Sequence, residues 1–147
     1  MSPTVTDGQR VLVNKACYAR VPSSMPPPWL PVLGGSGSAH YPFHPPTRGD
    51  IIVFHPPPPK DPRSDFIKRV IGVPGDTVDI GQGHVVVSGA ELNEPYIHQA
   101  SLPINSRFTH LTLAPDQFFV LGDNRGNSSD SSSWGAVVGE DIVGCVE

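Results

Sequence analysis

The sequence carries little charge, and what it carries is not clustered. Only 16% of its 147 residues are charged, and the formal net charge is −4. A protein that binds nucleic acid usually presents a basic patch to the phosphates. No such patch is available in this sequence, so no nucleic-acid partner is expected.

Long apolar runs are also absent. A transmembrane helix is indicated by about 18 or more consecutive apolar residues, and no segment reaches that length. A secretory signal would combine basic residues with a following apolar stretch, and this pattern is missing too. We expect the chain by itself to be soluble.

Signals for disulfide or metal chemistry are sparse. The two cysteines, Cys17 and Cys145, lie near opposite ends of the chain. They either pair or are small buried residues, and the sequence alone favours the second interpretation. The six histidines show no close pair at helical spacing with a third ligand, so no metal site is predicted.

Proline and glycine, by contrast, are abundant, with 18 and 15 residues. They are densest in residues 19–47, which we interpret as a low-complexity Pro/Gly/Ser-rich insertion without a core of its own. The chain length suits one domain with a modest core. We therefore expect a single domain over residues 1–147 that carries this insertion.

Short β-strands account for most of the remaining sequence. The apolar run Asp50–Phe54 is typical of a strand buried on both faces, and Asp65–Val73 is a second such run. Further strands are predicted at Val11–Val13, Thr77–Ile80, His84–Ser88, Phe118–Leu121 and, mixed with turns, Trp134–Val146. A hairpin loop of three residues, Gly81–Gly83, is expected between two of them. No strong amphipathic helix is visible, and the predicted fold class is all-β.

Lys68 is the first candidate for chemistry. In an extended strand, Phe66, Lys68 and Val70 share one face, while Ile67 and Arg69 lie on the other. Apolar neighbours desolvate an amine and lower its pKa, so that it can take a proton from a serine hydroxyl. On spacing alone, a lysine that reaches water and does nothing is the more common case.

The second candidate is the segment GDNRGNSSDSSSWG, residues Gly122–Gly135. Its residue types favour turns, because their side chains bond neighbouring backbone groups. Taken alone, the segment predicts a turn. As a functional loop, it could present Ser128 and Asp130 to orient a nearby base.

Together, these segments closely resemble the type I signal peptidases. The resemblance rests on the order of six blocks, which are PTVTDGQRVLVNK, RGDIIVF, FIKRVIGVPGD, ELNEPYI, GDNRGNSSDSSSWG and IVGCV. It covers Met1 to Val146 apart from Ala19–Thr47. The FIKRVIGVPGD and LNEPYI blocks and Trp134-Gly135 are most similar to cyanobacterial and chloroplast thylakoidal members.

The resemblance implies an activity and a set of catalytic residues. The family consists of membrane-anchored serine proteases that remove signal peptides by a Ser-Lys dyad, without a metal or cofactor. Lys68 would be the general base, and Ser128 would hydrogen-bond its amine. Asp123 and Asp130 would support the loop that carries Ser128.

The resemblance also implies how the substrate binds. The signal peptide would lie extended between two strands and pair with their backbones. Asp65, Phe66 and Ile67 match one strand, and Met1 to Pro3 match the start of the other. Val5 and Val53 would wall shallow pockets for small side chains, in keeping with cleavage after a small-x-small pattern.

The nucleophile itself falls outside the chain in this alignment. The family motif reads Ser-Met-x-Pro-Thr-Leu, and MSPTV fits only the part after the serine. The catalytic serine would directly precede Met1, so we expect a domain truncated at both ends that lacks its membrane helix and is inactive as it stands. Ser2 would point to the opposite face of a strand, and Ser24 lies in proline-rich sequence with no strand-forming continuation.

Two alternatives remain beside the protease. The chain could be a pseudoenzyme that binds signal-peptide-like segments without cutting them. A self-cleaving repressor-type protease would share the serine and lysine chemistry, but no DNA-binding domain or internal cleavage segment is visible in the sequence.

Overall fold

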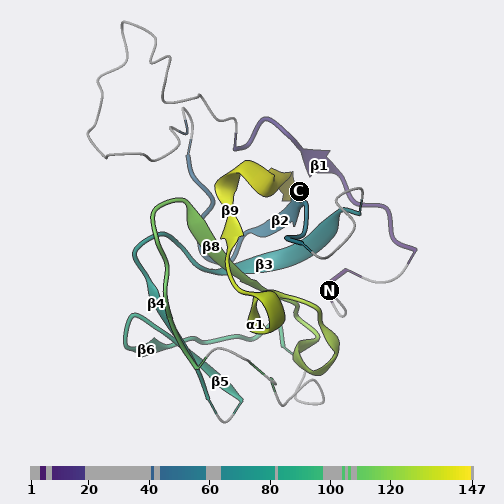
Figure 1. Ribbon diagram of the computed structural model, residues 1–147. Helices are drawn as coiled ribbons and strands as arrows, with labels where there is room; N and C mark the ends of the chain where they lie inside the picture. Colours follow the sequence, from purple (N-terminus) through teal and green to yellow (C-terminus); the bar gives the residue numbers. More distant parts are fainter. Residues whose placement is uncertain are drawn as a thin grey trace, which may run out of the picture.

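The computed structural model describes residues 4–5, 8–18, 41, 44–58, 64–81, 83–97, 104, 106 and 109–146. Within these residues the chain forms two antiparallel sheets (Figure 1). The larger sheet has the strand order β1-β10-β2-β3-β8-β9, and the smaller has the order β6-β5-β4-β7. The predicted all-β class is confirmed. Most of the proline-rich insertion predicted at residues 19–47 lies outside the described residues.

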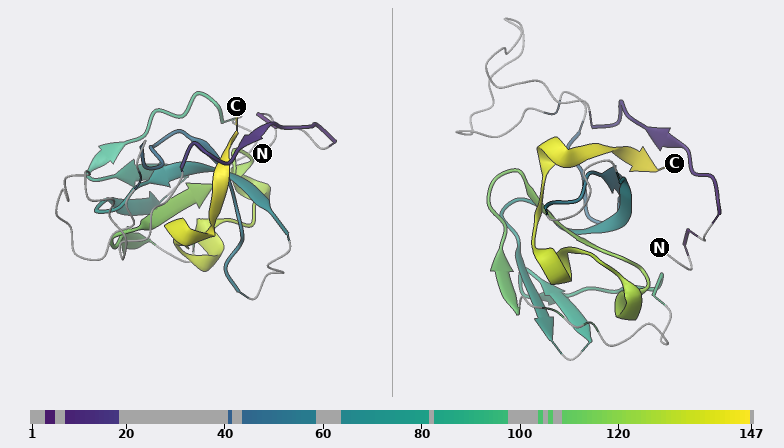
Figure 2. Two further views of the ribbon diagram at one scale, coloured as in Figure 1. Left: turned by 90° about the horizontal axis from the view of Figure 1, so that it is seen from above. Right: turned by 45° about the vertical axis from the view of Figure 1, so that its right-hand side comes forward.

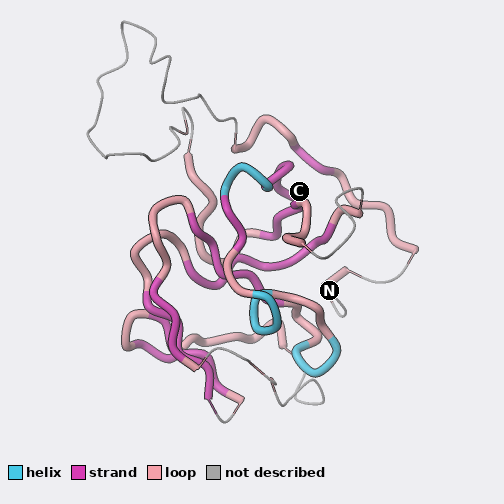
Figure 3. Tube along the Cα trace, viewed as in Figure 1, coloured by secondary structure: helices cyan, strands magenta, loops and turns pink. Residues whose placement is uncertain are grey.

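The elements are short, and loops and strands make up nearly all of the described chain (Figure 3). The strands are β1 (Val13–Asn14), β2 (Ile51–Phe54), β3 (Phe66–Gly72), β4 (Thr77–Gly81), β5 (His84–Val87), β6 (Ala90–Glu91), β7 (His110–Thr112), β8 (Gln117–Leu121), β9 (Val137–Val138) and β10 (Ile142–Val146). The helical elements are α1 (Ser131–Trp134) and the single 3-10 turns η2 (Arg125–Asn127) and η3 (Gly139–Asp141). Among the residues described, no helix has the length and apolar character needed to span a membrane.

The apolar runs fold as predicted, with one correction to the hairpin. β2, β3 and β8 form over the runs identified in the sequence. The hairpin between β4 and β5 is tighter than expected, because Gly81 still pairs with His84 in the ladder. Only residues 82 and 83 lie between the strands. Gly83 has a φ of 84°, a conformation that two-residue hairpin loops require and that glycine adopts without strain.

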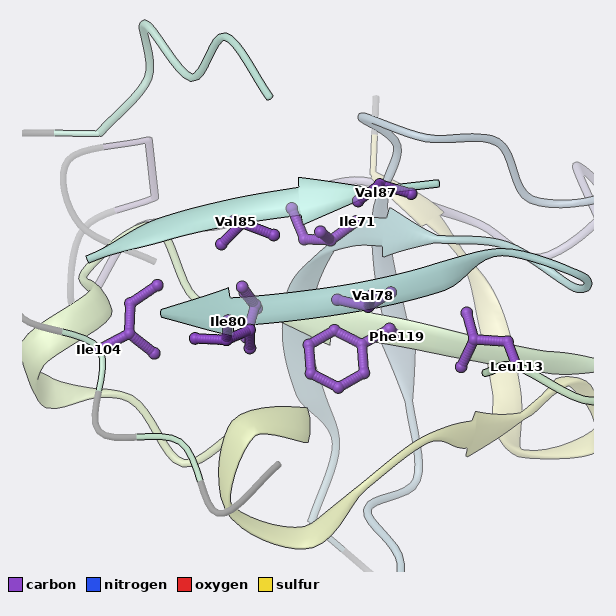
Figure 4. Close-up of a cluster of buried hydrophobic side chains, with 9 residues drawn as sticks. Ile71, Val78, Ile80, Val85, Val87, Ile104, Leu113 and Phe119 are labelled. Carbon is purple, nitrogen blue, oxygen red and sulfur yellow. The ribbon is translucent and has the colours of Figure 1, made fainter. Parts of the chain in front are cut away.

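β3 supplies both hydrophobic cores. Val70 packs on one face with Phe54 and Phe118. Ile71 points to the other face and packs with Phe119 and with residues of the smaller sheet, as the close-up in Figure 4 shows. Successive side chains of a strand point to opposite faces, and each fully buried Val, Ile or Phe contributes about 1.5–3 kcal/mol. β3 is therefore fixed from both sides.

The first and last strands of the described chain lie side by side. β1 pairs with β10 through Val13 with Val146 and Asn14 with Cys145, and the two strands are adjacent in Figure 2. A Cβ atom at Gly144 would lie 2.4 Å from the carbonyl oxygen of Asn14. Only glycine permits this close approach of the two backbones.

The cysteines form a disulfide, so the interpretation that both are unpaired is wrong. Cys17 and Cys145 are joined across a sequence separation of 128 residues, and their Cα atoms lie 6.2 Å apart. The reason is the pairing of β1 with β10. Asn14 lies opposite Cys145 in this pairing, and Cys17 follows Asn14 by three residues. That long-range pairing cannot be read from cysteine spacing alone.

Removal of the disulfide should destabilise the domain. In the double variant Cys17→Ala/Cys145→Ala, we expect the free energy of unfolding to fall by about 2–5 kcal/mol, because the unfolded chain regains the freedom of a long loop. Urea denaturation without reductant would measure this loss. With reductant, the wild type should unfold like the variant, and a wild type indifferent to reductant would contradict a stabilising role.

Candidate active site

Lys68 lies on β3 in a largely apolar setting. Its Nζ is 5.2 Å from the ring centroid of Phe66, as expected for two residues on one face of the strand, and it donates a hydrogen bond of 3.0 Å to the carbonyl of Ile67. Burial lowers the pKa of Lys68 below its ordinary value, while the negative charges of Asp130 and Asp123 act in the opposite direction. Burial prevails, so the neutral amine is easier to reach than in an exposed lysine.

One edge of β3 is open beside Lys68. β2 pairs with β3 from Phe66 to Arg69, but β8 pairs on the other edge only from Arg69 to Gly72. On the β8 side, residues 66–68 therefore have no partner strand within the described part of the chain. An extended peptide can add to such an edge by backbone hydrogen bonds.

Two of the residues expected to contact substrate lie next to β3, and Val53 is on the side that pairs with β2 and not on the open edge. Asp65 precedes β3, and its carboxylate lies 3.1 Å from Nδ1 of His55. Val53 pairs with Ile67 in the β2–β3 ladder and is 4% exposed. Met1 and Pro3 lie outside the described residues, and Val5 is half-buried. The substrate-binding role of these residues stays a prediction.

Asp123 joins three distant segments. It follows β8, is fully buried, and accepts hydrogen bonds from Arg69 Nε at 3.0 Å and Nη2 at 2.8 Å. Its Oδ2 also accepts a short hydrogen bond from Oγ1 of Thr4. The N-terminal motif segment is thereby tied to the residue that follows Lys68 on β3.

Asp130 closes the same loop from its other end. Its Oδ1 accepts hydrogen bonds from the backbone N of Ser132 at 3.1 Å and from its hydroxyl at 2.7 Å, and it caps the N-terminus of α1. Its Oδ2 accepts from the backbone N of Gly122 at 2.9 Å. Both oxygens of the Asp130 carboxylate are therefore hydrogen-bonded within the loop.

Ser128 is half-buried, and its buried hydroxyl oxygen is unpaired. Its Oγ has no hydrogen-bond partner, and a Cβ atom at Gly122 would lie 2.2 Å from it. The hydrogen bond between Ser128 and Lys68 that the resemblance implies is not formed in this structure, where the amine bonds to the carbonyl of Ile67. A buried hydroxyl left unpaired costs about 1–3 kcal/mol. The Ser128 hydroxyl is thus free to bond a further group, and its catalytic role stays a prediction.

A further set of charged residues beside Asp123 received no role from the sequence. Arg125 donates to Glu94 Oε2 from Nη1 at 2.9 Å, and the hydroxyl of Tyr96 donates to Glu94 Oε1 at 2.8 Å. The guanidinium carbon of Arg69 lies 4.0 Å from the ring centroid of Tyr96. Charged residues are few in this sequence, so those within the ELNEPYI and GDNR blocks could have been noticed as candidates for ion pairs. Which of them pair with each other depends on the strand topology.

The chemistry that these groups offer is proton transfer. Among the described residues, no group of three or more His, Cys, Asp or Glu side chains could hold a metal ion. The cluster instead combines a desolvated amine, a vacant hydroxyl and two buried carboxylates. A neutral amine in this setting can serve as the general base for a hydroxyl nucleophile.

Comparisons with known proteins point to one family. The family model described as signal peptidase, peptidase S26, matches residues 1–147. Signal peptidase I of Leptolyngbya laminosa is 40% identical over 151 residues, which cover 98% of this chain and 72% of that protein. Probable signal peptidase I-1 of Synechocystis is 37% identical over 98% of this chain and 63% of its own length. A crystal structure of a signal peptidase I from Enterococcus faecalis V583 has a TM-score of 0.58 at 30% identity and covers 71% of this chain and 98% of that one.

Proposed function

This chain belongs to the signal peptidase family, peptidase S26, and from this premise we propose that it is the catalytic domain of a type I signal peptidase that works with a Ser-Lys dyad. The predicted family and its serine endopeptidase class are confirmed. The cyanobacterial character of the sequence blocks agrees with the Leptolyngbya and Synechocystis relatives.

The observation that carries the proposal is the hydrogen bond from Thr4 to Asp123. Thr4 belongs to the part of the family motif that follows the nucleophile, and Asp123 is bonded to Arg69, the neighbour of Lys68. A serine directly before Met1 would enter the site from this anchored segment. The base and the nucleophile would then meet although they are far apart in sequence.

In the proposed mechanism, neutral Lys68 takes the proton of that serine as the serine oxygen attacks the scissile carbonyl. Protonated Lys68 then gives its proton to the leaving amine, and water hydrolyses the acyl-enzyme with Lys68 again as base. The vacant hydroxyl of Ser128 would accept a hydrogen bond from the Lys68 amine and turn it toward the serine. Asp123 and Asp130 would hold the loop that carries Ser128.

The proposed substrate is the signal peptide of an exported precursor, bound extended along the open edge of β3. Asp65, Phe66 and Ile67 would line one side, and Met1 and Pro3 the other. Val5 and Val53 would limit the pockets to small side chains. A membrane helix preceding the motif would hold the domain on the trans side of a thylakoid or plasma membrane, where such precursors emerge.

A chain extended so that a serine directly precedes Met1 tests the proposal. A second version carries alanine at that place as the matched control, and both are incubated with a synthetic peptide containing an Ala-x-Ala site. We expect cleavage after the second alanine by the serine version alone. Cleavage by both versions would contradict the dyad. Binding without cleavage by both would favour a catalytically inactive peptide-binding protein.

A further inference from the structure

Side chains beside the site form a ring that begins and ends on one loop. Its members alternate in charge or stack on one another, and each contacts the next as described above. In order, they are Asp123, Arg69, Tyr96, Glu94 and Arg125. Because Asp123 and Arg125 are two residues apart, the ring closes through the loop backbone.

Two members of the ring, Glu94 and Tyr96, lie outside β3 and the loop, on a tight turn. The carbonyl of Glu94 accepts a hydrogen bond of 3.1 Å from the backbone N of Ile97, with Pro95 as the second residue of the turn. Proline fixes φ at the value that this position requires. The side chains of Glu94 and Tyr96 are therefore presented by a preorganised backbone.

The ring grips the loop at two adjacent residues. Arg69 holds the carboxylate of Asp123, and Arg125 Nε donates to the carbonyl of Gly122 at 3.2 Å. Ser128 packs directly on Gly122, as the 2.2 Å approach to a Cβ at that position shows. A shift of the Glu94 turn would reach the Ser128 hydroxyl through this contact.

The ring is also shielded from solvent, so its charges act at short range without much screening. The side chains of Arg125 and Glu94 are 1% and 11% exposed, and those of Arg69 and Asp123 are 11% and 1% exposed. Tyr96 covers the face of the Arg69 guanidinium. This cover favours the orientation in which both donors of Arg69 meet Asp123.

We propose that the Glu94–Tyr96 turn is a positioning element for catalysis. It fixes the positions of Arg69 and Gly122, and through them the position of Ser128 relative to Lys68. The inference rests on the proposed function and deepens it. Neither Glu94 nor Tyr96 touches the reacting atoms. Both act through Arg69 and Arg125.

The test uses the serine-extended chain with Tyr96→Phe, Tyr96→Leu and Glu94→Gln, and with Glu91→Gln as the matched control. Glu91 is an exposed glutamate three residues before Glu94 that pairs with His84. Tyr96→Leu and Glu94→Gln should lower kcat by about tenfold or more while KM stays within about twofold. Tyr96→Phe keeps an aromatic side chain over the Arg69 guanidinium and should give a smaller loss of kcat. Glu91→Gln should behave as the unchanged enzyme.

The pH profile separates positioning from a merely structural role. The charged groups that act on Lys68 are Asp130 and Asp123. If Arg69 neutralises Asp123 less well, the pKa of Lys68 rises, and the acidic limb of the rate profile moves to higher pH. This shift is expected for Tyr96→Leu and Glu94→Gln and not for Glu91→Gln.

The outcomes distinguish the two proposals. The positioning role would be overturned if the loss of rate matched the loss of folded protein, measured by thermal unfolding, and the pH profile did not move. An unchanged kcat in Tyr96→Leu and Tyr96→Phe, variants that leave the buried Arg125–Glu94 pair intact, would overturn it too. Absence of cleavage by the serine-extended chain itself would instead overturn the proposed function.

Discussion

Replacement of Lys68 by alanine is expected to lower kcat of the serine-extended chain by about a hundred- to ten-thousandfold, because the reaction loses its general base. The fold should survive, since among the described residues the amine bonds to no other segment and donates to the carbonyl of Ile67, its neighbour in β3. Peptide cleavage and thermal unfolding would be measured together. Lys15→Ala, which removes an exposed lysine, is the matched control and should keep full activity.

The pH dependence of cleavage by the serine-extended chain with Lys68 in place is a second test of the same role. Only the neutral amine can accept a proton, and burial lowers the pKa of Lys68 from its ordinary value of 10.5. The rate should therefore rise with pH through a midpoint below 10.5 and level off above it. Substantial cleavage by Lys68→Ala, with the same rise, would show that another group is the base.

Replacement of Asp123 by alanine should give the largest loss of stability, about 3–5 kcal/mol. The variant would leave the guanidinium of Arg69, 11% exposed, without its carboxylate, and it would also release Thr4. Domains of this size are stable by only about 5–15 kcal/mol in total. The midpoint and slope of urea denaturation measure the change.

Asp79→Ala is the matched control for this prediction. Asp79 pairs with His110 on the smaller sheet, where its side chain is 40% exposed. Exposed ion pairs contribute about 0–1 kcal/mol, so Asp79→Ala should change the unfolding midpoint little. Equal losses in the two variants would contradict the structural importance of the buried carboxylate.

The sequence was a good guide to the strands that carry the cores. β2, β3 and β8 coincide with continuous apolar runs, because both faces of these strands are covered. β6 and β7 have two and three residues, mostly exposed, and offer no such run. α1 is a four-residue helix of three serines and a tryptophan. It exists because Asp130 caps it, and residues of this kind equally favour a turn.

The candidate site divides in a similar way. Lys68, Ser128, Asp123 and Asp130 were predicted from their place in sequence blocks, and their catalytic roles stay predictions. The other members of the ring, Arg69, Glu94, Tyr96 and Arg125, were not predicted, since ion pairs between segments depend on which strands lie together. The cysteine pair was misjudged for the same reason, because the partner of Cys17 lies 128 residues away.

The strand order has a consequence for how the protein is made. β10 lies between β1 and β2 in the sheet, yet it is the last of the described strands to leave the ribosome. Until it emerges, β1 has no neighbour in the sheet, and contacts between such distant segments form late. A nascent chain that ends before Ile142 would thus hold Lys68 on a β3 flanked by β2 and β8, while β1 still lacked β10, its neighbour in the sheet.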